Sequence, residues 1–175
     1  NDKHILPITK NEYESIMTVG PNATSYDALL GNYHGTTNKA INFVEGITNA
    51  VDASTRVEYD LGCDYNDTTH FGGIWAAGNA KLTIAVMGLS PVLEGEAGDA
   101  FLSPSGGDRN SIALPASEIA YLKKLRASIS TPIIVVLTAG SAVDIASIEP
   151  YADAIIYAWY PGEQGGNALA DIVFG

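Results

Sequence analysis

The sequence predicts an α/β fold, a three-layer sandwich in which a mostly parallel sheet carries helices on both faces. Two observations support this prediction. Residues 82–87, 132–137 and 154–159 are nearly continuous apolar runs, which is typical of strands buried on both faces. Strands and segments of helical character also alternate along the chain, and this order favours right-handed crossovers within one parallel sheet.

In the first half, residues 15–19 form a short apolar run that Gly and Pro end, which predicts a strand. Residues 26–30 predict one or two helical turns, and residues 40–50 have the apolar spacing of an amphipathic helix. Residues 56–59 alternate in polarity and predict an edge strand. Residues 71–80 predict a helix that its three glycines weaken.

In the second half, residues 115–127 predict a helix with proline in its first turn, and Glu118 suits the positive end of its dipole. The apolar runs at 132–137 and 154–159 predict buried strands. Residues 165–174 are rich in small and apolar side chains and predict a closing helix.

Composition restricts the classes of function. The 175 residues fit one domain, and 46% hydrophobic with 17% charged residues is typical of a globular chain. The net charge of −11 opposes binding to nucleic acid or to an anionic membrane surface. The polar start, Asn1 to His4, precedes no apolar run, so we expect no signal peptide, and no segment is long enough to span a membrane.

We expect neither a metal nor a cofactor. Cys63 is the single cysteine, and the three histidines show no ligand spacing. Residues 162–166 contain glycines but lack the order of a phosphate-binding loop, so a nucleotide- or flavin-binding domain is a weak alternative. Ser141 has no histidine partner at a recognisable spacing, which disfavours a serine hydrolase.

The candidate chemistry lies on the loop from 88 to 110, which is much longer than most strand-to-helix connections. Glu94 and Glu96 follow the 82–87 strand, at the edge of the sheet where open α/β folds bind ligands. Two glutamates near Arg109 can acquire different pKa values, as an acid/base site requires. The structural alternatives are a solvated acidic loop and an ion pair between Asp108 and Arg109.

Several motifs then occur in a familiar order. The sequence is similar to the C-terminal α/β-sandwich domain of family 3 glycoside hydrolases, nearest to the β-glucosidase and β-xylosidase branches. The resemblance rests on the segments VGPNA at 19–23, LGNYHG at 30–35, VMGLS at 86–90, LEGE at 93–96, GGDR at 106–109, LPAS at 114–117 and AWYPGEQGG at 158–166.

This resemblance implies a retaining hydrolase that removes terminal, non-reducing β-linked sugars from an oligosaccharide or other β-glycoside. A preceding (β/α)8 barrel would supply an aspartate nucleophile, and this domain would supply the acid/base glutamate. Family members carry that glutamate two or three residues before Asp-Arg. Glu96 stands three before Asp99, so we favour it and keep Glu94 as the alternative. Asp108 and Arg109 follow an insertion and would support the loop or bind substrate.

No segment of residues 1–175 has the pattern of a barrel, so we interpret the chain as an excised C-terminal domain that is inactive alone. The parent protein would be periplasmic or secreted. Apolar surface around Trp159 and Tyr160 would pair with the barrel and could favour self-association. The alternative from another class is a non-catalytic sugar- or partner-binding module of the same architecture.

Overall fold

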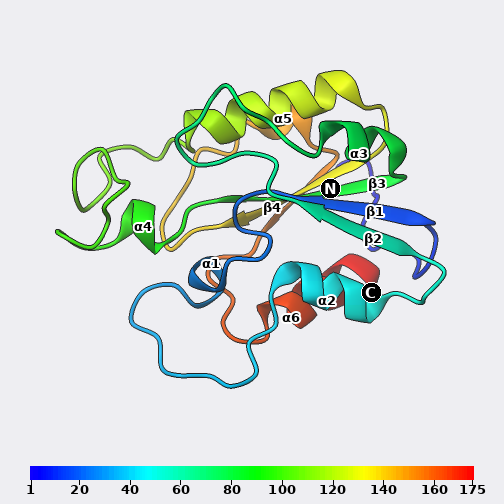
Figure 1. Ribbon diagram of the computed structural model, residues 1–175, viewed down its shortest axis with the longest axis horizontal. Coiled ribbons are helices and arrows are strands. Elements are labelled where there is room, and N and C mark those ends of the chain that lie inside the picture. The colour runs from blue at the N-terminus through cyan, green and yellow to red at the C-terminus, as the bar shows by residue number, and fades with distance from the viewer.

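The computed structural model describes all 175 residues and contains a five-stranded parallel sheet in the order β2-β1-β3-β4-β5 (Figure 1). The strands are β1 (Ser15–Val19), β2 (Arg56–Asp60), β3 (Leu82–Gly88), β4 (Ile133–Thr138) and β5 (Ala154–Tyr157). The predicted α/β class is confirmed, and the 56–59 segment lies at the edge of the sheet as expected.

The helices cover both faces of the sheet (Figure 1). On one face lie α3 (Ile74–Asn79) and α5 (Ala116–Ser128), and on the other lie α1 (Tyr26–Leu30), α2 (Phe43–Ala50) and α6 (Gly165–Phe174). A single turn, α4 (Pro91–Glu94), follows β3, and a 3-10 turn at Glu149–Tyr151 precedes β5. None of these helices has the length and apolar character needed to cross a membrane.

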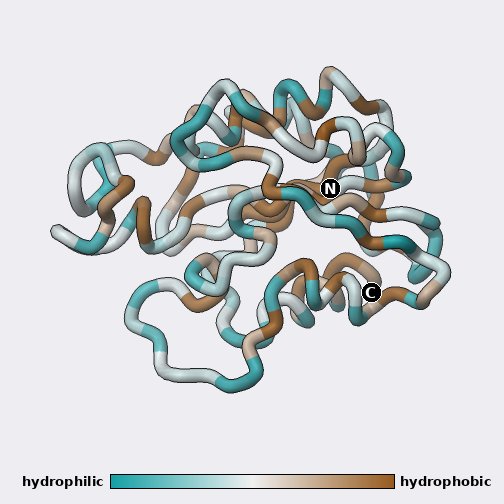
Figure 2. Tube along the Cα trace, viewed as in Figure 1, coloured by the Kyte–Doolittle hydropathy of each residue, from teal (hydrophilic) through white to brown (hydrophobic).

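Each face of the sheet has its own hydrophobic core, because successive residues of a strand point to opposite faces. Met87 and Val135 belong to the core beneath α5, where Tyr121 is fully buried. Val86 and Val136 belong to the core beneath α2 and α6. Figure 2 shows the result as apolar central strands surrounded by largely hydrophilic loops.

Helix α2 packs closely on α6 because a glycine from each helix lies at their contact. A Cβ atom on Gly46 would lie 2.0 Å from the carbonyl oxygen of Gly166. The helix begins later than the sequence pattern predicts, because the Asn42 side chain accepts from the Glu45 amide and the Glu45 side chain accepts from the Asn42 amide.

Two other boundaries differ from the prediction for backbone reasons. Strand β5 ends at Tyr157 instead of residue 159, and Trp159 has a φ of 56°, which a strand cannot accommodate. Helix α3 begins at Ile74 because Gly73, with a φ of 67°, takes the left-handed conformation just before it. The turn α4 was not predicted.

Candidate active site

The loops that follow β1, β3 and β4 are tied together at the carboxyl edge of the sheet. Asn22, after β1, donates from its side-chain amide to Thr138 Oγ1 (2.7 Å) and to the Leu89 carbonyl oxygen (3.2 Å). The chain leaves β3 through Gly88, where φ is +112° and a Cβ atom would lie 2.2 Å from the Thr138 carbonyl oxygen. Only glycine fits there. The long loop therefore begins at a point where the end of β3 is packed directly against the end of β4.

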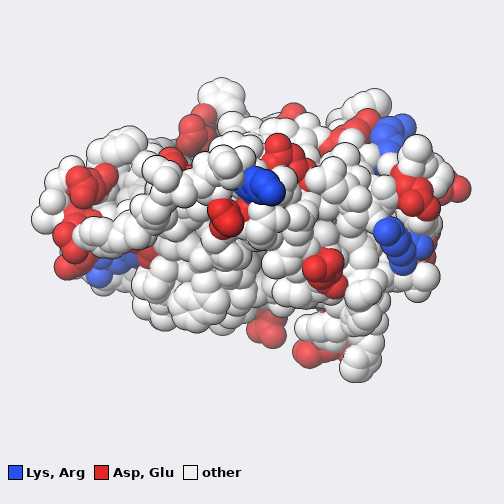
Figure 3. Space-filling view, turned by 90° about the horizontal axis from the view of Figure 1, so that it is seen from below, with Lys and Arg blue, Asp and Glu red and all other residues white.

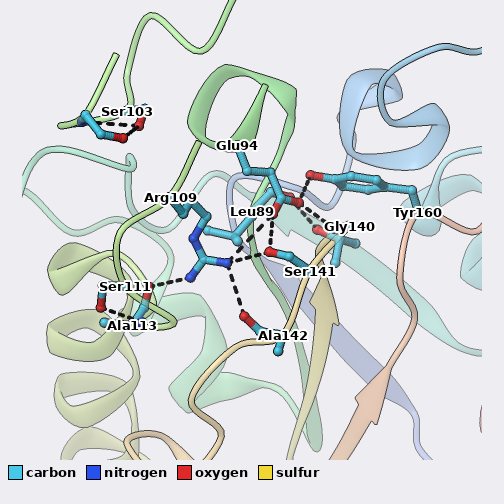
Figure 4. Close-up of polar contacts among 12 residues, drawn as sticks. Leu89, Glu94, Ser103, Arg109, Ser111, Ala113, Gly140, Ser141, Ala142 and Tyr160 are labelled. Atoms are coloured by element: carbon cyan, nitrogen blue, oxygen red, sulfur yellow. Dashed lines mark hydrogen bonds and ion pairs between the residues drawn. The ribbon is translucent and has the colours of Figure 1, made fainter. Parts of the chain in front are cut away.

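Glu94 lies at the end of α4 with only 6% of its side chain exposed (Figure 4). Its Oε2 accepts a hydrogen bond from Ser141 Oγ (2.7 Å). Its Oε1 accepts from the Gly140 amide and from the Tyr160 hydroxyl. Burial, followed by the bond to this carboxylate, raises the pKa of Tyr160, which therefore remains a donor. Glu94 thus joins the loops that follow β3, β4 and β5.

Arg109 approaches the same carboxylate from the other end of the long loop. Its Nη1 lies 3.7 Å from Glu94 Oε2, and 13% of its side chain is exposed. It also donates to Ser141 Oγ (2.8 Å) and to the carbonyl oxygens of Ala142 (3.2 Å) and Ala113 (3.1 Å). The segment from 95 to 108 is therefore closed at its base by a charged pair, and both ends rest on the loop after β4 (Figure 4).

The expected ion pair between Asp108 and Arg109 is not formed. Arg109 turns toward the loop after β4, where Ser141 Oγ and the Ala142 carbonyl oxygen accept hydrogen bonds from it, and it forms an ion pair with Glu94. The Asp108 side chain makes no ion pair; its backbone carbonyl accepts from Ser105 Oγ at 2.6 Å. Within this dipeptide, it is Arg109 whose side chain contacts the neighbouring loops.

Glu96 lies two residues beyond Glu94, on the long loop. Unlike the Glu94 side chain, Glu96 is exposed to solvent. Tyr33 lies near Glu96, and this neighbouring carboxylate raises the pKa of the Tyr33 hydroxyl. Tyr33 itself is 82% exposed and has a φ of 56°. A bulky side chain in the left-handed conformation is strained, and such residues cluster at functional sites.

A cavity of about 710 Å³ opens between these loops. Glu94, Asp108 and Arg109 line it together with Tyr33, and Gly140, Ser141 and Tyr160 complete its wall. The volume lies in the range of small-molecule sites. Acidic side chains gather at the end of the molecule that carries α4, with a basic side chain among them (Figure 3). No group of three or more His, Cys, Asp or Glu side chains is placed to hold a metal ion.

The structure brings Glu94, Asp108 and Arg109 to one cavity. Glu96 does not line this cavity but lies near Tyr33, which does. The sequence interpretation missed the polar contacts of Tyr160 and Ser141 with Glu94. A signal for them exists, since Ser141 follows β4, the neighbour of β3, and Tyr160 follows β5, the next strand along the same parallel sheet. Whether they contact Glu94, however, depends on the directions of their side chains, which their spacing in the sequence does not reveal.

The fold and the site define an α/β domain with a cavity lined by carboxylate side chains at the carboxyl edge of its sheet. Residues 1–175 match the Glycosyl hydrolase family 3 C-terminal domain along their whole length, and the chain belongs to this family. The sequence resemblance is thereby confirmed.

Relatives and solved structures agree with this assignment. The chain is 34% identical to the probable β-D-xylosidase 6 of Arabidopsis thaliana, covering all of this chain and 21% of that protein. It is 28% identical to a β-xylosidase of Formosa agariphila, again over the full chain and 24% of the relative. The chain thus spans about a fifth to a quarter of the length of these curated relatives.

Among solved structures, a GH3 exo-β-xylosidase in complex with a xylobiose aziridine activity-based probe superimposes with a TM-score of 0.82 at 28% identity. The match covers 100% of this chain and 22% of that one. A GH3 β-glucosidase of Bifidobacterium adolescentis gives a TM-score of 0.75 at 28% identity, covering 98% of this chain and 24% of the other.

Proposed function

We propose that this chain is the acid/base domain of a retaining, exo-acting β-glycosidase of the β-xylosidase or β-glucosidase type, with Glu96 as the proton donor. The observation that carries the proposal is the contrast between the two glutamates. Glu96 is exposed beside the cavity, whereas both carboxylate oxygens of Glu94 are occupied by donors from three other residues.

Glu94 is poorly suited to deliver a proton to a substrate. An acid catalyst must direct its hydroxyl at the leaving oxygen, within hydrogen-bond distance. Ser141, Gly140 and Tyr160 all donate to Glu94, and Arg109 adds a positive charge 3.7 Å away. Glu94 therefore fixes this part of the loop to its neighbours, and so positions Glu96, two residues later.

A retaining site needs a second carboxyl group roughly 5–5.5 Å from the acid. The family resemblance assigns this nucleophile to an aspartate of a (β/α)8 barrel in a longer protein. Exposed apolar side chains support the docking of another domain at this end, because Trp159 is 56% exposed, Ile112 59% and Phe101 75%. The cavity would then be closed between the two domains.

In the proposed reaction, the barrel aspartate attacks the anomeric carbon while Glu96 gives its proton to the leaving glycosidic oxygen. The bond between carbon and oxygen breaks, and a glycosyl-enzyme ester forms. Glu96, now ionised, takes a proton from water as that water attacks the ester, which restores both carboxyl groups.

The decisive experiment compares Glu96→Gln with the matched variant Glu94→Gln in the longer protein. Loss of the acid slows cleavage of poor leaving groups by about 10²–10⁴-fold, while activated aryl glycosides lose much less. Loss of the Glu94 contacts slows both substrates to a similar degree. Equal losses in Glu96→Gln would overturn the acid role, and no effect from either variant would favour a non-catalytic sugar- or partner-binding module.

A second experiment tests the division of labour between domains. The purified chain, shown to be folded by circular dichroism, is expected to be inactive on aryl β-glucosides and β-xylosides and to recover activity when the barrel is added in trans. Turnover by the chain alone, abolished by Glu96→Ala, would contradict the shared site.

A further inference from the structure

The long loop leaves the sheet at Gly88 and Leu89, and buried groups hold both residues. The Leu89 carbonyl oxygen accepts hydrogen bonds from Asn22 Nδ2 (3.2 Å) and from Thr138 Oγ1 (2.9 Å). The Gly88 amide donates to the side-chain carboxyl group of Glu118, at 2.8 Å. The start of the loop is therefore fixed from the first turn of α5 as well as from β4 and the loop after β1.

The amide that Glu118 binds is one that no strand reaches. Successive amides of a strand point to opposite sides, and the Leu89 amide donates to the Thr138 carbonyl oxygen on β4 (2.6 Å). The Gly88 amide therefore points to the side of β1, but β1 pairs with β3 only as far as Ala85. Gly88 is buried, so without Glu118 its amide would have no acceptor, which is costly.

The position of Gly88 carries over to the glutamates of the loop through a short, hydrogen-bonded segment. The Ser90 carbonyl oxygen accepts from the amides of Leu93 (2.9 Å) and Glu94 (3.2 Å), so α4 is built directly on the start of the loop. Ser90 itself is buried, and Glu96 follows two residues after the end of α4. A shift at the end of β3 would therefore displace Glu96.

We propose that Glu118 is a positioning residue: by holding the Gly88 amide, its carboxyl group fixes the point where the loop leaves the sheet and thereby places Glu96. This inference rests on the proposed function, since it takes Glu96 as the acid. Among the side chains that hold the start of the loop, Glu118 alone can ionise, because Asn22 and Thr138 have no titratable group. Its charge therefore controls the hold.

Ionisation of Glu118 would loosen this contact. The side chain is completely buried and Oε1 has no hydrogen-bond partner, so the Gly88 amide alone would solvate the charge. Burial raises the pKa of Glu118, which stays neutral until the solution becomes alkaline. The nearby titratable groups are the Cys63 thiol and the Tyr65 hydroxyl, which burial keeps neutral, and Asp64 lies close to both. The ionised carboxylate gains from any opening that admits water, and such an opening frees Gly88.

NMR of the isotope-labelled chain tests the link between Glu118 and the loop, from about pH 6.5 to about pH 9. We expect the amide signals of Gly88 and of Gly95, which precedes Glu96, to move together with a midpoint of about pH 8. Glu118→Gln should abolish both movements. A response at Gly88 alone, no response at either residue, or an unchanged response at Gly95 in the variant would overturn the proposal.

Activity of the longer protein on methyl β-D-xyloside, at a pH where Glu118 is neutral, gives the second readout. Glu118→Leu removes the acceptor and should lower kcat by roughly tenfold or more while KM changes little, because misplacing the acid affects the chemical step. Glu118→Gln keeps an acceptor of the same shape and should restore most of kcat. Tyr121→Phe is the matched control, because it removes a hydrogen bond from the same helix to the Gly72 carbonyl oxygen (3.2 Å) and not to the loop.

Equal losses of kcat from Glu118→Leu and Glu118→Gln, or from Glu118→Leu and Tyr121→Phe, would overturn the positioning role. If Glu118→Leu does not fold, the NMR comparison with Glu118→Gln decides. A failure of the proposed function is seen separately: if Glu96→Gln shows no acid role while the Gly88 and Gly95 signals respond as expected, Glu118 still positions the loop and only the acid assignment falls.

Discussion

The carboxylate of Glu118, in the first turn of α5, accepts a hydrogen bond of 2.8 Å from the amide of Gly88 at the end of β3. Its other oxygen, Oε1, has no partner, and the side chain is completely buried. Burial raises the pKa of Glu118 to about 8, against the lowering effect of the Gly88 amide. The sequence places this residue at the positive end of a helix, but the side chain instead holds the strand from which the long loop departs.

The first prediction concerns pH. Glu118 holds its proton more tightly in the folded protein than in the unfolded chain, so stability is highest below the unfolded pKa and falls as pH rises toward about 8. The slope from this one group is at most roughly 1.4 kcal/mol per pH unit. Urea unfolding from about pH 5 to about pH 9 measures it, and Glu118→Gln is expected to flatten the curve.

Two other titratable groups lie close to Glu118, the Cys63 thiol and the Tyr65 hydroxyl, and Asp64 lies close to both of them. Burial raises the pKa values of the Cys63 thiol and the Tyr65 hydroxyl, so both remain neutral in this pH range. Exposed Glu149 serves as the control, because Glu149→Gln should leave the slope unchanged. An unaltered slope in Glu118→Gln would contradict the assignment.

The second prediction concerns the pair that closes the long loop. Removing one partner leaves a largely buried charge without its counterpart, so Glu94→Gln or Arg109→Met should each lower the free energy of unfolding by about 2 kcal/mol or more. The double variant should lose less than the sum of the two. Denaturant unfolding of all four proteins measures this coupling, and strict additivity would show that the pair is energetically independent.

The third prediction concerns the contact between α2 and α6. Gly46→Ala would push a methyl group into the Gly166 carbonyl, so we expect a loss of about 1–3 kcal/mol and a lower Tm. Gly35→Ala is the matched control, since nothing lies within 4 Å of its added Cβ atom. Comparable losses from both variants would show that the contact between α2 and α6 is not the cause, because the effect of Gly→Ala on the unfolded chain by itself raises stability.

The fourth prediction concerns association. The exposed apolar residues beside the cavity should make the isolated chain self-associate with rising concentration, and Trp159→Ser with Ile112→Ser should shift it toward monomer in sedimentation analysis. Trp75→Ser changes an even more exposed tryptophan on α3, at the opposite end of the molecule from α4 (Figure 1). If that variant alone reduced association, the surface beside the cavity would not be the interface.

Much of the fold is predictable because buried parallel strands are apolar throughout, as residues 133–138 show. The edge position of β2 follows from its alternating polarity. The sequence pattern does not reveal which residue is the hydrogen-bond partner of each buried polar group. Glu94 looks like a loop carboxylate in the sequence, but its neighbours Ser141 and Tyr160 lie 47 and 66 positions away.

The boundary errors have similarly local causes. A left-handed tryptophan at 159 is not signalled by its residue type, so β5 appears longer in the sequence than it is. The capping box at Asn42 was readable in principle, because a cap residue followed three positions later by glutamate is a recognised start of a helix.

The ion pair between Glu94 and Arg109 determines how the loop segment between them can vary in length. Because Glu94 and Arg109 both contact Ser141 on the loop after β4, the chain between them has both of its ends fixed to one place. Doubling the length of such a segment costs only about 0.6 kcal/mol of closure entropy. The length of this segment can therefore change at little cost in free energy without altering the sheet beneath it.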